Sequence, residues 1–237
     1  PLENAHVGGL NRGSAVEPHP ASMYHNPAAI VLLRGTHVFV DGTVRIETGR
    51  IRRAALSSGT GNPGAGADLA SARERFTHWT PDLYFGVTSD LGTSRVVLGL
   101  AVFTPFAEVQ KYADPVSQVA PDAAAPNRYH RIRAEWYHLF VLPVAAVRLH
   151  PRVRVGLGFG YVRSIVDMAF GRDCAIRSCR GGIATAPPFE EPRWTEKVAV
   201  DGGEDSFLFN LGVLVRLPWN IDVGIAYRLS LIPILRC

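Results

Sequence analysis

The chain has 237 residues, of which 47% are hydrophobic and 19% are charged, and its mean hydropathy is +0.07. This hydrophobicity excludes an intrinsically disordered chain, and 3 cysteines are too few for a disulfide-dense scaffold. The formal net charge of +4 comes mostly from arginines scattered singly among apolar residues, which argues against nucleic-acid binding. No stretch of about 18 residues is both apolar and without charged side chains, so a transmembrane helix is excluded as well.

The two ends of the chain are unusual. It begins at Pro1, without a methionine or the segments of a signal peptide, and ends abruptly in an apolar run at Cys237. We therefore expect either a portion of a longer sequence or a chain that has lost a targeting segment. Closer to the N-terminus, Asn26-Pro27 is a typical turn initiator, and Pro27 can open a short helix that continues through Leu32.

Alternation of apolar and polar residues with a period of two predicts β-strands from residue 37 onward. A first strand is expected from His37 to about Thr48. Three pairs of strands follow, each joined by a short turn, at residues 92–94, 150–151 and 218–220. The sequence thus predicts seven antiparallel strands.

The connections between these pairs are long, at about 49–80, 105–134 and 171–205. Compact soluble domains seldom contain several such loops, whereas outer-membrane barrels combine short periplasmic turns with long external loops. A soluble β-sandwich or lipocalin-like barrel would show the same alternation. However, strands of about 11 to 18 residues suit a tilted membrane crossing better than a soluble sheet. We therefore predict an all-β, antiparallel outer-membrane β-barrel.

Two further features fit a barrel with hydrophobic cargo. Aromatic residues near the expected strand ends are typical of interfacial girdles, namely Trp79, Tyr84, Phe103, Trp136, Tyr137, Phe170, Phe207, Trp219 and Tyr227. The alternation also places Phe140, Leu142 and Val144 toward the lumen, on the face opposite to Tyr137 and Leu139. A water-filled porin would carry charges there, so an apolar lumen favours a hydrophobic ligand.

Four motifs resemble the FadL-type outer-membrane transporters of long-chain fatty acids and aromatic hydrocarbons. In chain order they are 21–30 with Asn26-Pro27-Ala28, 99–106 ending in Thr-Pro-Phe, 127–130 together with 142–149, and 155–160. Family members are fourteen-stranded barrels plugged by an N-terminal hatch. The resemblance therefore implies a hatch at 1–35 and the first half of a barrel, seven strands, at 36–237.

The resemblance also implies passive transport. A ligand is captured among the external loops, passes to a pocket in the barrel, and leaves sideways into the membrane through a gap at a kinked third strand. In this chain the hatch on the ligand path comprises Asn26, Pro27 and Ala28, and the strand end at the gap comprises Phe103, Thr104, Pro105 and Phe106. The expected partners are a hydrophobic small molecule and outer-membrane lipid, and the full-length protein is expected to be a monomer.

Both hatch and gap residues also have a plainer interpretation. Pro105 supports a gap because a proline cannot donate a ladder hydrogen bond, but the alternative is that it merely closes the strand and starts the following loop. Ala107 stands where the family often has glycine, which weakens the expectation of a sharp kink. Asn26-Pro27 can serve as plug structure without touching the ligand.

Other chemistry-bearing residues do not form a recognisable site. The 8 histidines include no HExxH motif, and no G-x-S-x-G motif is present, so we expect no enzyme, catalytic residue, metal or cofactor. Cys174 and Cys179 are spaced for a small disulfide loop in an oxidising exterior, while a zinc site would need two further ligands. The alternative function is a structural or adhesive barrel that binds partners through its long loops.

Overall fold

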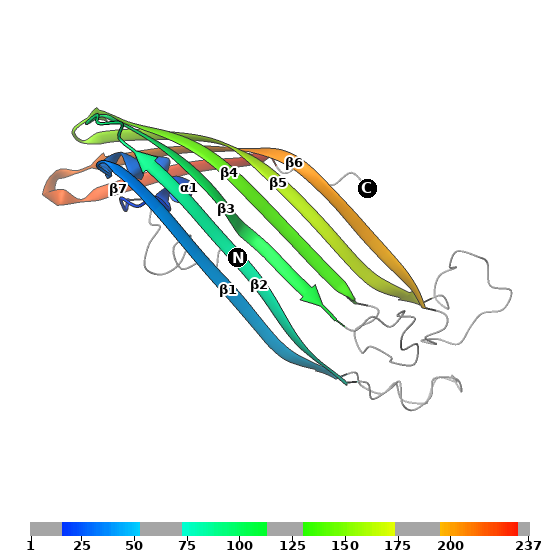
Figure 1. Ribbon diagram of the computed structural model, residues 1–237. Coiled ribbons are helices and arrows are strands. Elements are labelled where there is room, and N and C mark those ends of the chain that lie inside the picture. The colour runs from blue at the N-terminus through cyan, green and yellow to red at the C-terminus, as the bar shows by residue number, and fades with distance from the viewer. Residues whose placement is uncertain (1–15, 53–72, 113–129, 174–194, 232–237) are drawn as a thin grey trace, which may run out of the picture.

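The structure, a computed structural model, describes residues 16–52, 73–112, 130–173 and 195–231. Two short helical elements come first, followed by seven long strands (Figure 1). The elements are α1 (Ser22–His25), η1 (Pro27–Leu32), β1 (Thr36–Arg52), β2 (Arg73–Ser89), β3 (Val96–Lys111), β4 (Arg133–His150), β5 (Val153–Asp173), β6 (Thr195–Arg216), η5 (Pro218–Asn220) and β7 (Asp222–Leu231).

The seven strands form one antiparallel sheet in the order β1-β2-β3-β4-β5-β6-β7, so each strand pairs with its neighbour in the chain. The strands run side by side and form a half-barrel, and α1 and η1 lie at the end that carries the short turns (Figure 1). The predicted all-β, antiparallel half-barrel is therefore confirmed.

The strands are longer than the alternation of apolar residues suggested. Segments expected to begin loops at 49, 105 and 171 still belong to strands, which end at Arg52, Lys111 and Asp173. In the same way, β2 already begins at Arg73, well before the expected end of the first loop at about 80. Near 49 and 171 the reason is that both faces of the sheet become polar, so the pairing continues where the apolar signal has stopped.

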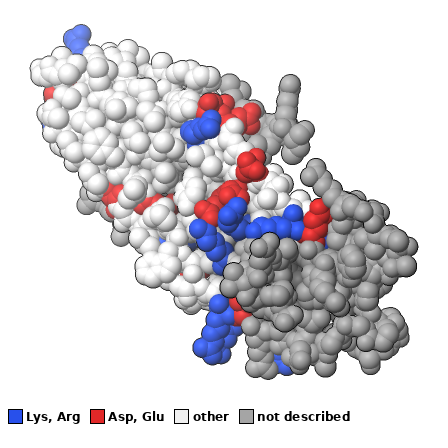
Figure 2. Space-filling model, turned by 45° about the vertical axis from the view of Figure 1, so that its right-hand side comes forward, with Lys and Arg blue, Asp and Glu red and all other residues white. Residues whose placement is uncertain are grey.

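The outer face of the half-barrel is defined by large apolar side chains that are exposed on all seven strands. Examples from the first and last strands are Val40, Ile46 and Ile225, which are 70%, 52% and 68% exposed. This surface carries almost no charge over one part of the molecule, whereas charged residues gather near the other end (Figure 2). Such a distribution is that of a sheet with one face in lipid.

The opposite, inner face packs against α1 and η1, and the core of the molecule lies between them. Its fully buried side chains include Met23 and Ile30 from the helical elements, and Leu142 and Leu208 from β4 and β6. Among the described residues, no helix is long and apolar enough to span a membrane.

Two aromatic residues expected in an interfacial girdle belong instead to this core. Tyr84 and Phe103 are 1% and 2% exposed on the inner face, and their ring centroids lie 5.3 Å apart. The girdle assignment was therefore wrong for both. Tyr84 and Phe103 lie near expected strand ends, which suggested a place at the membrane interface. Phe85 and Val102 face outward, however, so the alternation along each strand turns the neighbouring Tyr84 and Phe103 inward.

Candidate functional site

The inner helical segment, residues 22–32, rests in a notch formed by two glycines. Gly156 of β5 and Gly212 of β6 face each other across the strand pair. A Cβ atom on Gly156 would lie 2.3 Å from the backbone nitrogen of Ala28, and one on Gly212 would lie 1.9 Å from Oδ1 of Asn26. Any side chain at either position would therefore collide with the segment. The predicted hatch residues Asn26, Pro27 and Ala28 occupy this notch and are buried.

Asn26 connects the segment to the sheet as well as shaping it. Its Oδ1 atom accepts a hydrogen bond of 3.0 Å from the backbone nitrogen of Ala28 and caps η1, with Pro27 in the first position. Its Nδ2 atom donates to the carbonyl oxygen of Val213 on β6 over 3.2 Å. One side chain thus fixes both the turn and its place on the barrel wall.

Side chains from the strands hold the carbonyl groups of the segment. Asn210 of β6 donates from Nδ2 to the carbonyl oxygens of Met23 and Tyr24, at 2.9 and 3.0 Å. Just before the segment, the carbonyl oxygen of Pro20 accepts a hydrogen bond of 2.9 Å from the hydroxyl of Tyr84. These groups are buried, where an unpaired carbonyl would be costly. The segment is therefore bound through specific polar contacts and not only by apolar packing.

Arg228 of β7 covers the end of α1. Its guanidinium donates to the carbonyl oxygen of Tyr24, and its Cζ atom lies 3.6 Å from the centroid of the Tyr24 ring. Burial, together with the positive charge of Arg228, lowers the pKa of His25 to about 4. Burial raises the pKa of Tyr24. The side chains of Tyr24 and His25 are therefore both uncharged at neutral pH beside Arg228.

An aromatic cluster continues from the segment across four strands. Tyr24 makes edge contacts with Phe103 and Phe140 at centroid distances of 5.1 and 6.3 Å. Phe103 stacks on Phe140 at 5.3 Å, and Phe39 of β1 lies 5.8 Å from Tyr84. The structure places Phe140, Leu142 and Val144 on this inner face, 6%, 0% and 4% exposed. Sequence analysis did not identify Phe39 as part of the lumen, although its alternation with Val38 and Val40 indicates it.

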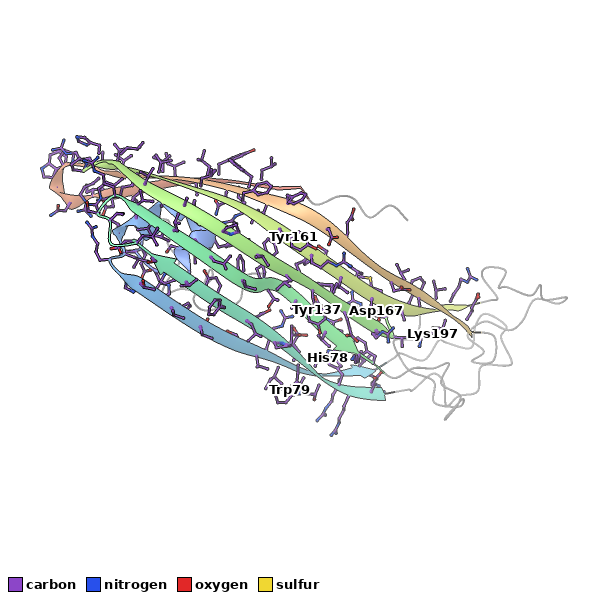
Figure 3. The ribbon with its side chains drawn as sticks, turned by 45° about the horizontal axis from the view of Figure 1, so that its top comes forward. His78, Trp79, Tyr137, Tyr161, Asp167 and Lys197 are labelled. Atoms are coloured by element: carbon purple, nitrogen blue, oxygen red, sulfur yellow. The ribbon has the colours of Figure 1, made fainter. Side chains whose placement is uncertain are left out.

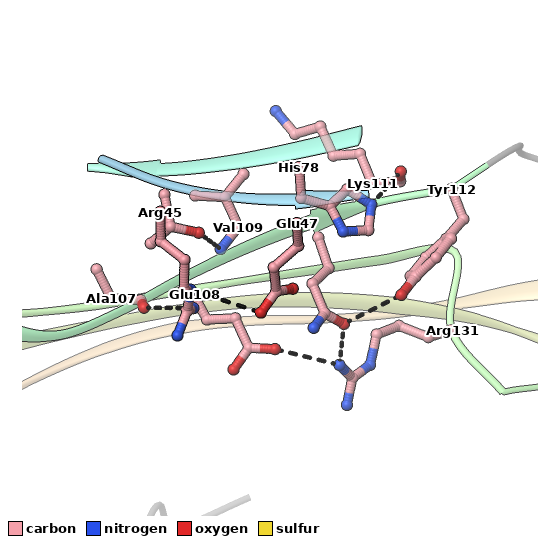
Figure 4. Close-up of polar contacts among 11 residues, drawn as sticks. Arg45, Glu47, His78, Ala107, Glu108, Val109, Lys111, Tyr112 and Arg131 are labelled. Atoms are coloured by element: carbon pink, nitrogen blue, oxygen red, sulfur yellow. Dashed lines mark hydrogen bonds and ion pairs between the residues drawn. The ribbon is translucent and has the colours of Figure 1, made fainter. Parts of the chain in front are cut away.

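Toward the long connections the inner face becomes polar (Figure 4). Nε of Arg45 lies 3.5 Å from Oε1 of Glu47, and Nη1 of Arg131 lies 3.6 Å from Oε1 of Glu108. Arg131 also donates to the side-chain oxygen of Gln110. The lumen wall is thus apolar around the helical segment and carries paired charges further out.

The pairing of β2 with β3 stops halfway along the strands. Register partners run from Ser89↔Leu98 to Tyr84↔Phe103, and the described residues beyond them form no further ladder between these strands. On the other side, β3 remains paired with β4 as far as Lys111↔Arg133. We call the unpaired stretch, β2 residues 73–83 facing β3 residues 104–111, the seam.

A bulge in β3 marks the start of the seam. Phe103 pairs with Phe140, and Phe106 pairs with His138, so two residues of β3, Thr104 and Pro105, oppose one residue of β4. The bulge also shifts the alternation, because odd positions face inward before it and even positions such as Glu108 face inward after it.

Pro105 is buried inside a strand that continues for six more residues, to Lys111. The interpretation that it closes the strand is therefore wrong. A proline is tolerated there because the bulge removes the need for its missing N–H group. Phe106 is placed in β3 by its backbone.

Side chains bridge the seam in place of the backbone ladder. Thr104 Oγ1 accepts from the backbone nitrogen of Leu83 over 3.1 Å, at the start of the seam. Further along, the hydroxyl of Thr80 accepts from the nitrogen of Val109 over 3.3 Å (Figure 4).

Two longer side chains complete these bridges (Figure 4). His78 Nε2 lies 2.8 Å from the carbonyl oxygen of Lys111, and since a carbonyl only accepts, this nitrogen carries the hydrogen. Arg45 reaches from β1 past β2 and donates to the carbonyl oxygen of Ala107 over 3.5 Å. Sequence analysis identified Thr104 and Pro105 but none of the bridging residues on β1 and β2, because their role depends on the register of three strands.

The described residues contain no group of three or more His, Cys, Asp or Glu side chains that could hold a metal ion. Cys174 and Cys179 lie outside the described residues.

Comparison with known proteins adds to this geometry. The family model of outer membrane protein transport proteins (OMPP1/FadL/TodX) matches residues 7–232. Among solved structures, the fold is similar to that of a Pseudomonas aeruginosa FadL homologue, with a TM-score of 0.65 and 17% sequence identity. The match covers 96% of this chain and 52% of the homologue, so the chain spans about half of the homologue's length. The curated proteins contain no match.

Proposed function

The chain belongs to the OMPP1/FadL/TodX family of outer membrane transport proteins, and from this premise we propose that it guides a long-chain fatty acid or aromatic hydrocarbon to a lateral exit at the seam. Proteins of this family lie in the bacterial outer membrane and transport hydrophobic molecules. The observation that carries the finer proposal is the seam between β2 and β3, which begins beside the aromatic cluster of the lumen.

The position of the seam supports an exit into lipid. Tyr84 and Phe103, the last paired residues before the seam, belong to the aromatic cluster on the inner face. Leu83, the next residue of β2, is 63% exposed on the outer face. A hydrophobic molecule that passes between the strands here would move from aromatic rings directly to the lipid-facing surface.

The bridges across the seam suit a passage that is closed at rest. Unpaired backbone groups are not tolerated in hydrocarbon, so a permanently open gap between two strands would be costly. The hydroxyl groups of Thr80 and Thr104 satisfy backbone N–H groups of the facing strand without a ladder. Opening then requires the loss of a few separate hydrogen bonds and not of a continuous row.

The inner helical segment serves as the hatch in this scheme. Tyr24 lies on Phe103 and Phe140, so the segment covers the part of the aromatic cluster nearest to the seam. A ligand that reaches these rings must displace Tyr24 or slide past it. The polar contacts of Asn26 and Asn210 define the resting position from which the segment moves.

A binding experiment tests the ligand class. The full-length protein in detergent should bind a fluorescent long-chain fatty acid saturably, and an aromatic hydrocarbon should compete. Phe140→Ala should weaken binding by about tenfold, which corresponds to the loss of about 1.4 kcal/mol of aromatic contact with the ligand. Phe159→Ala, on the outer face, is the matched control and should bind normally. Absence of saturable, competed binding would favour the alternative of a structural or adhesive barrel.

A further inference from the structure

Outward-facing arginines gather where β1 and β2 approach the first long connection. Arg50 of β1 faces Arg75 of β2, and Arg52 lies at the next outward position of β1. The side chains of Arg50, Arg52 and Arg75, which we call the arginine group, are exposed. Like charges directly opposite each other weaken an antiparallel pair, and an anion between them would relieve the repulsion.

The arginine group lies just beyond the apolar part of the outer face. Along β1 and β2 the facing outward pairs change from apolar to hydroxyl to cationic, in the order Ile46↔Trp79, Thr48↔Thr77 and Arg50↔Arg75. Trp79 is 59% exposed and projects outside the sheet, away from His78 (Figure 3). A tryptophan on a lipid-facing surface marks the level of the headgroups. Four residues of strand, about 13 Å, separate it from Arg75, which places the guanidinium groups at or just outside that level.

The side of the membrane follows from the connections. The arginine group lies at the end of the hairpin that leads into residues 53–72, whereas β2 and β3 are joined at the opposite end by a short turn. Long connections of outer-membrane barrels face the exterior. The arginines therefore lie at the outer leaflet.

Other outward cations at this end of the sheet are neutralised by the protein itself. The guanidinium groups of Arg163 and Arg133 each lie 2.7 Å from a carboxylate oxygen, that of Asp205 and that of Asp167 respectively. Nζ of Lys111 lies 2.9 Å from Oε1 of Glu135. These three pairs span β3 to β6, where each cation has a carboxylate partner on the same face.

The arginine group differs from them. Within the described part of the chain, Arg50, Arg52 and Arg75 take part in no hydrogen bond or ion pair. The nearest acidic residues along the two strands, Glu47 and Glu74, alternate to the inner face, where Oε1 of Glu47 lies 3.5 Å from Nε of Arg45. Among the described residues, the outward charge at this end of β1 and β2 is thus uncompensated.

We propose that Arg50, Arg52 and Arg75 bind a phosphate group of an outer-leaflet glycolipid. Guanidinium groups match phosphate oxygens with paired hydrogen bonds, and basic groups at the membrane surface bind anionic headgroups. One phosphate between Arg50 and Arg75 converts a repulsive cross-strand pair into a bridged one. The acyl chains of the same glycolipid then lie along Ile46 and Trp79. This site is on the outer face and is independent of the transported molecule.

The test compares three probes on one purified protein in detergent. The probes are a bis-phosphorylated disaccharide glycolipid, the same glycolipid without its phosphates, and inorganic phosphate. Binding is measured by native mass spectrometry for the wild type, Arg50→Gln/Arg75→Gln, and Arg163→Gln as a matched outward control. Heat-dependent gel mobility verifies that every variant is folded.

The wild type should bind the phosphorylated glycolipid at least tenfold more tightly than the dephosphorylated form. The double variant should lose about tenfold in affinity, as expected for hydrogen bonds between charged groups, and Arg163→Gln should lose none. Equal binding of the two glycolipids, an unaffected double variant, or an equal loss in Arg163→Gln would overturn the proposal. Full competition by millimolar inorganic phosphate would assign the site to free anions and overturn the lipid as its ligand.

Discussion

Gly156 and Gly212 lie directly opposite each other on β5 and β6, and the turn from Asn26 to Ala28 occupies the space that their missing side chains leave. The glycines are therefore required by the close approach of another backbone and not by their own conformation. This contact fixes where the inner helical segment rests on the barrel wall.

Gly156→Ala should displace the inner helical segment. The new methyl group would lie 2.3 Å from backbone atoms of Pro27 and Ala28, which cannot rotate away. We expect a loss of about 1–3 kcal/mol in the free energy of unfolding, as for other overpacked sites. Amide hydrogen exchange in residues 22–32 should accelerate. Gly42→Ala, whose Cβ would meet Leu83 at an ordinary 3.4 Å, is the control and should show neither effect.

Asn210→Leu should loosen the same segment by a different route. The side chain keeps its branched shape and its number of heavy atoms, but the carbonyl oxygens of Met23 and Tyr24 lose their buried donor. Each unsatisfied group costs about 1–3 kcal/mol, which should appear as a lower free energy of unfolding. Ser206→Ala on the same face of β6 is a suitable comparison, since its buried hydroxyl has no partner among the described residues. If the two variants were equally stable, the amide contacts would contribute nothing.

Acid should weaken the docking of the segment through His25. The folded pKa of about 4 lies below the ordinary value of 6.5, because burial and Arg228 disfavour the charged ring. A lowered pKa means that the docked state binds fewer protons, so docking is fully stable above pH 6.5 and weakens as the pH falls toward 4. Hydrogen exchange at residues 22–32 should show this slope. His25→Gln should remove it, and an unchanged slope in that variant would assign the effect to other groups.

The sequence predicts the faces of the sheet better than the ends of its strands. Alternation through Phe140, Leu142 and Val144 identifies the inner face, since one side of each strand must be apolar for lipid. Near Arg50 and Arg172, charges occur on both faces, so the alternation carries no signal although the ladder continues. Strand ends in this region depend on pairing and not on burial.

The candidate site was only partly predictable for a related reason. Pro105 reveals that the ladder is disturbed, but the bulge and the shift of facing residues after it depend on the partner strand β4. Predicting that His78 and Thr80 bridge the seam requires the register of β2 against β3. Predicting the glycine notch requires the register of β5 against β6. Contacts of this kind, between residues that are far apart in the sequence, leave no local pattern in a single sequence.

Pro105→Val should slow uptake in the full-length protein. Valine restores a backbone N–H group at the bulge and favours continuous pairing, so the seam should open less readily. We expect a decrease in the rate of fatty-acid uptake with unchanged binding of the fluorescent ligand. Pro143→Val on β4, where the register with both neighbouring strands is the same before and after the proline, controls for the loss of proline as such. Unchanged uptake in Pro105→Val would remove this residue from the exit.

The most direct measurement is uptake by a protein whose seam can be locked. Leu83→Cys/Thr104→Cys places two cysteines on facing strands at the start of the seam, where the backbone of Leu83 already contacts the side chain of Thr104. Phe85→Cys/Val102→Cys places the matched pair within the intact ladder. Oxidation of the seam pair should abolish fatty-acid uptake and reduction should restore it, whereas the ladder pair should transport equally in both states. Full uptake with the seam disulfide formed would contradict a lateral exit between β2 and β3.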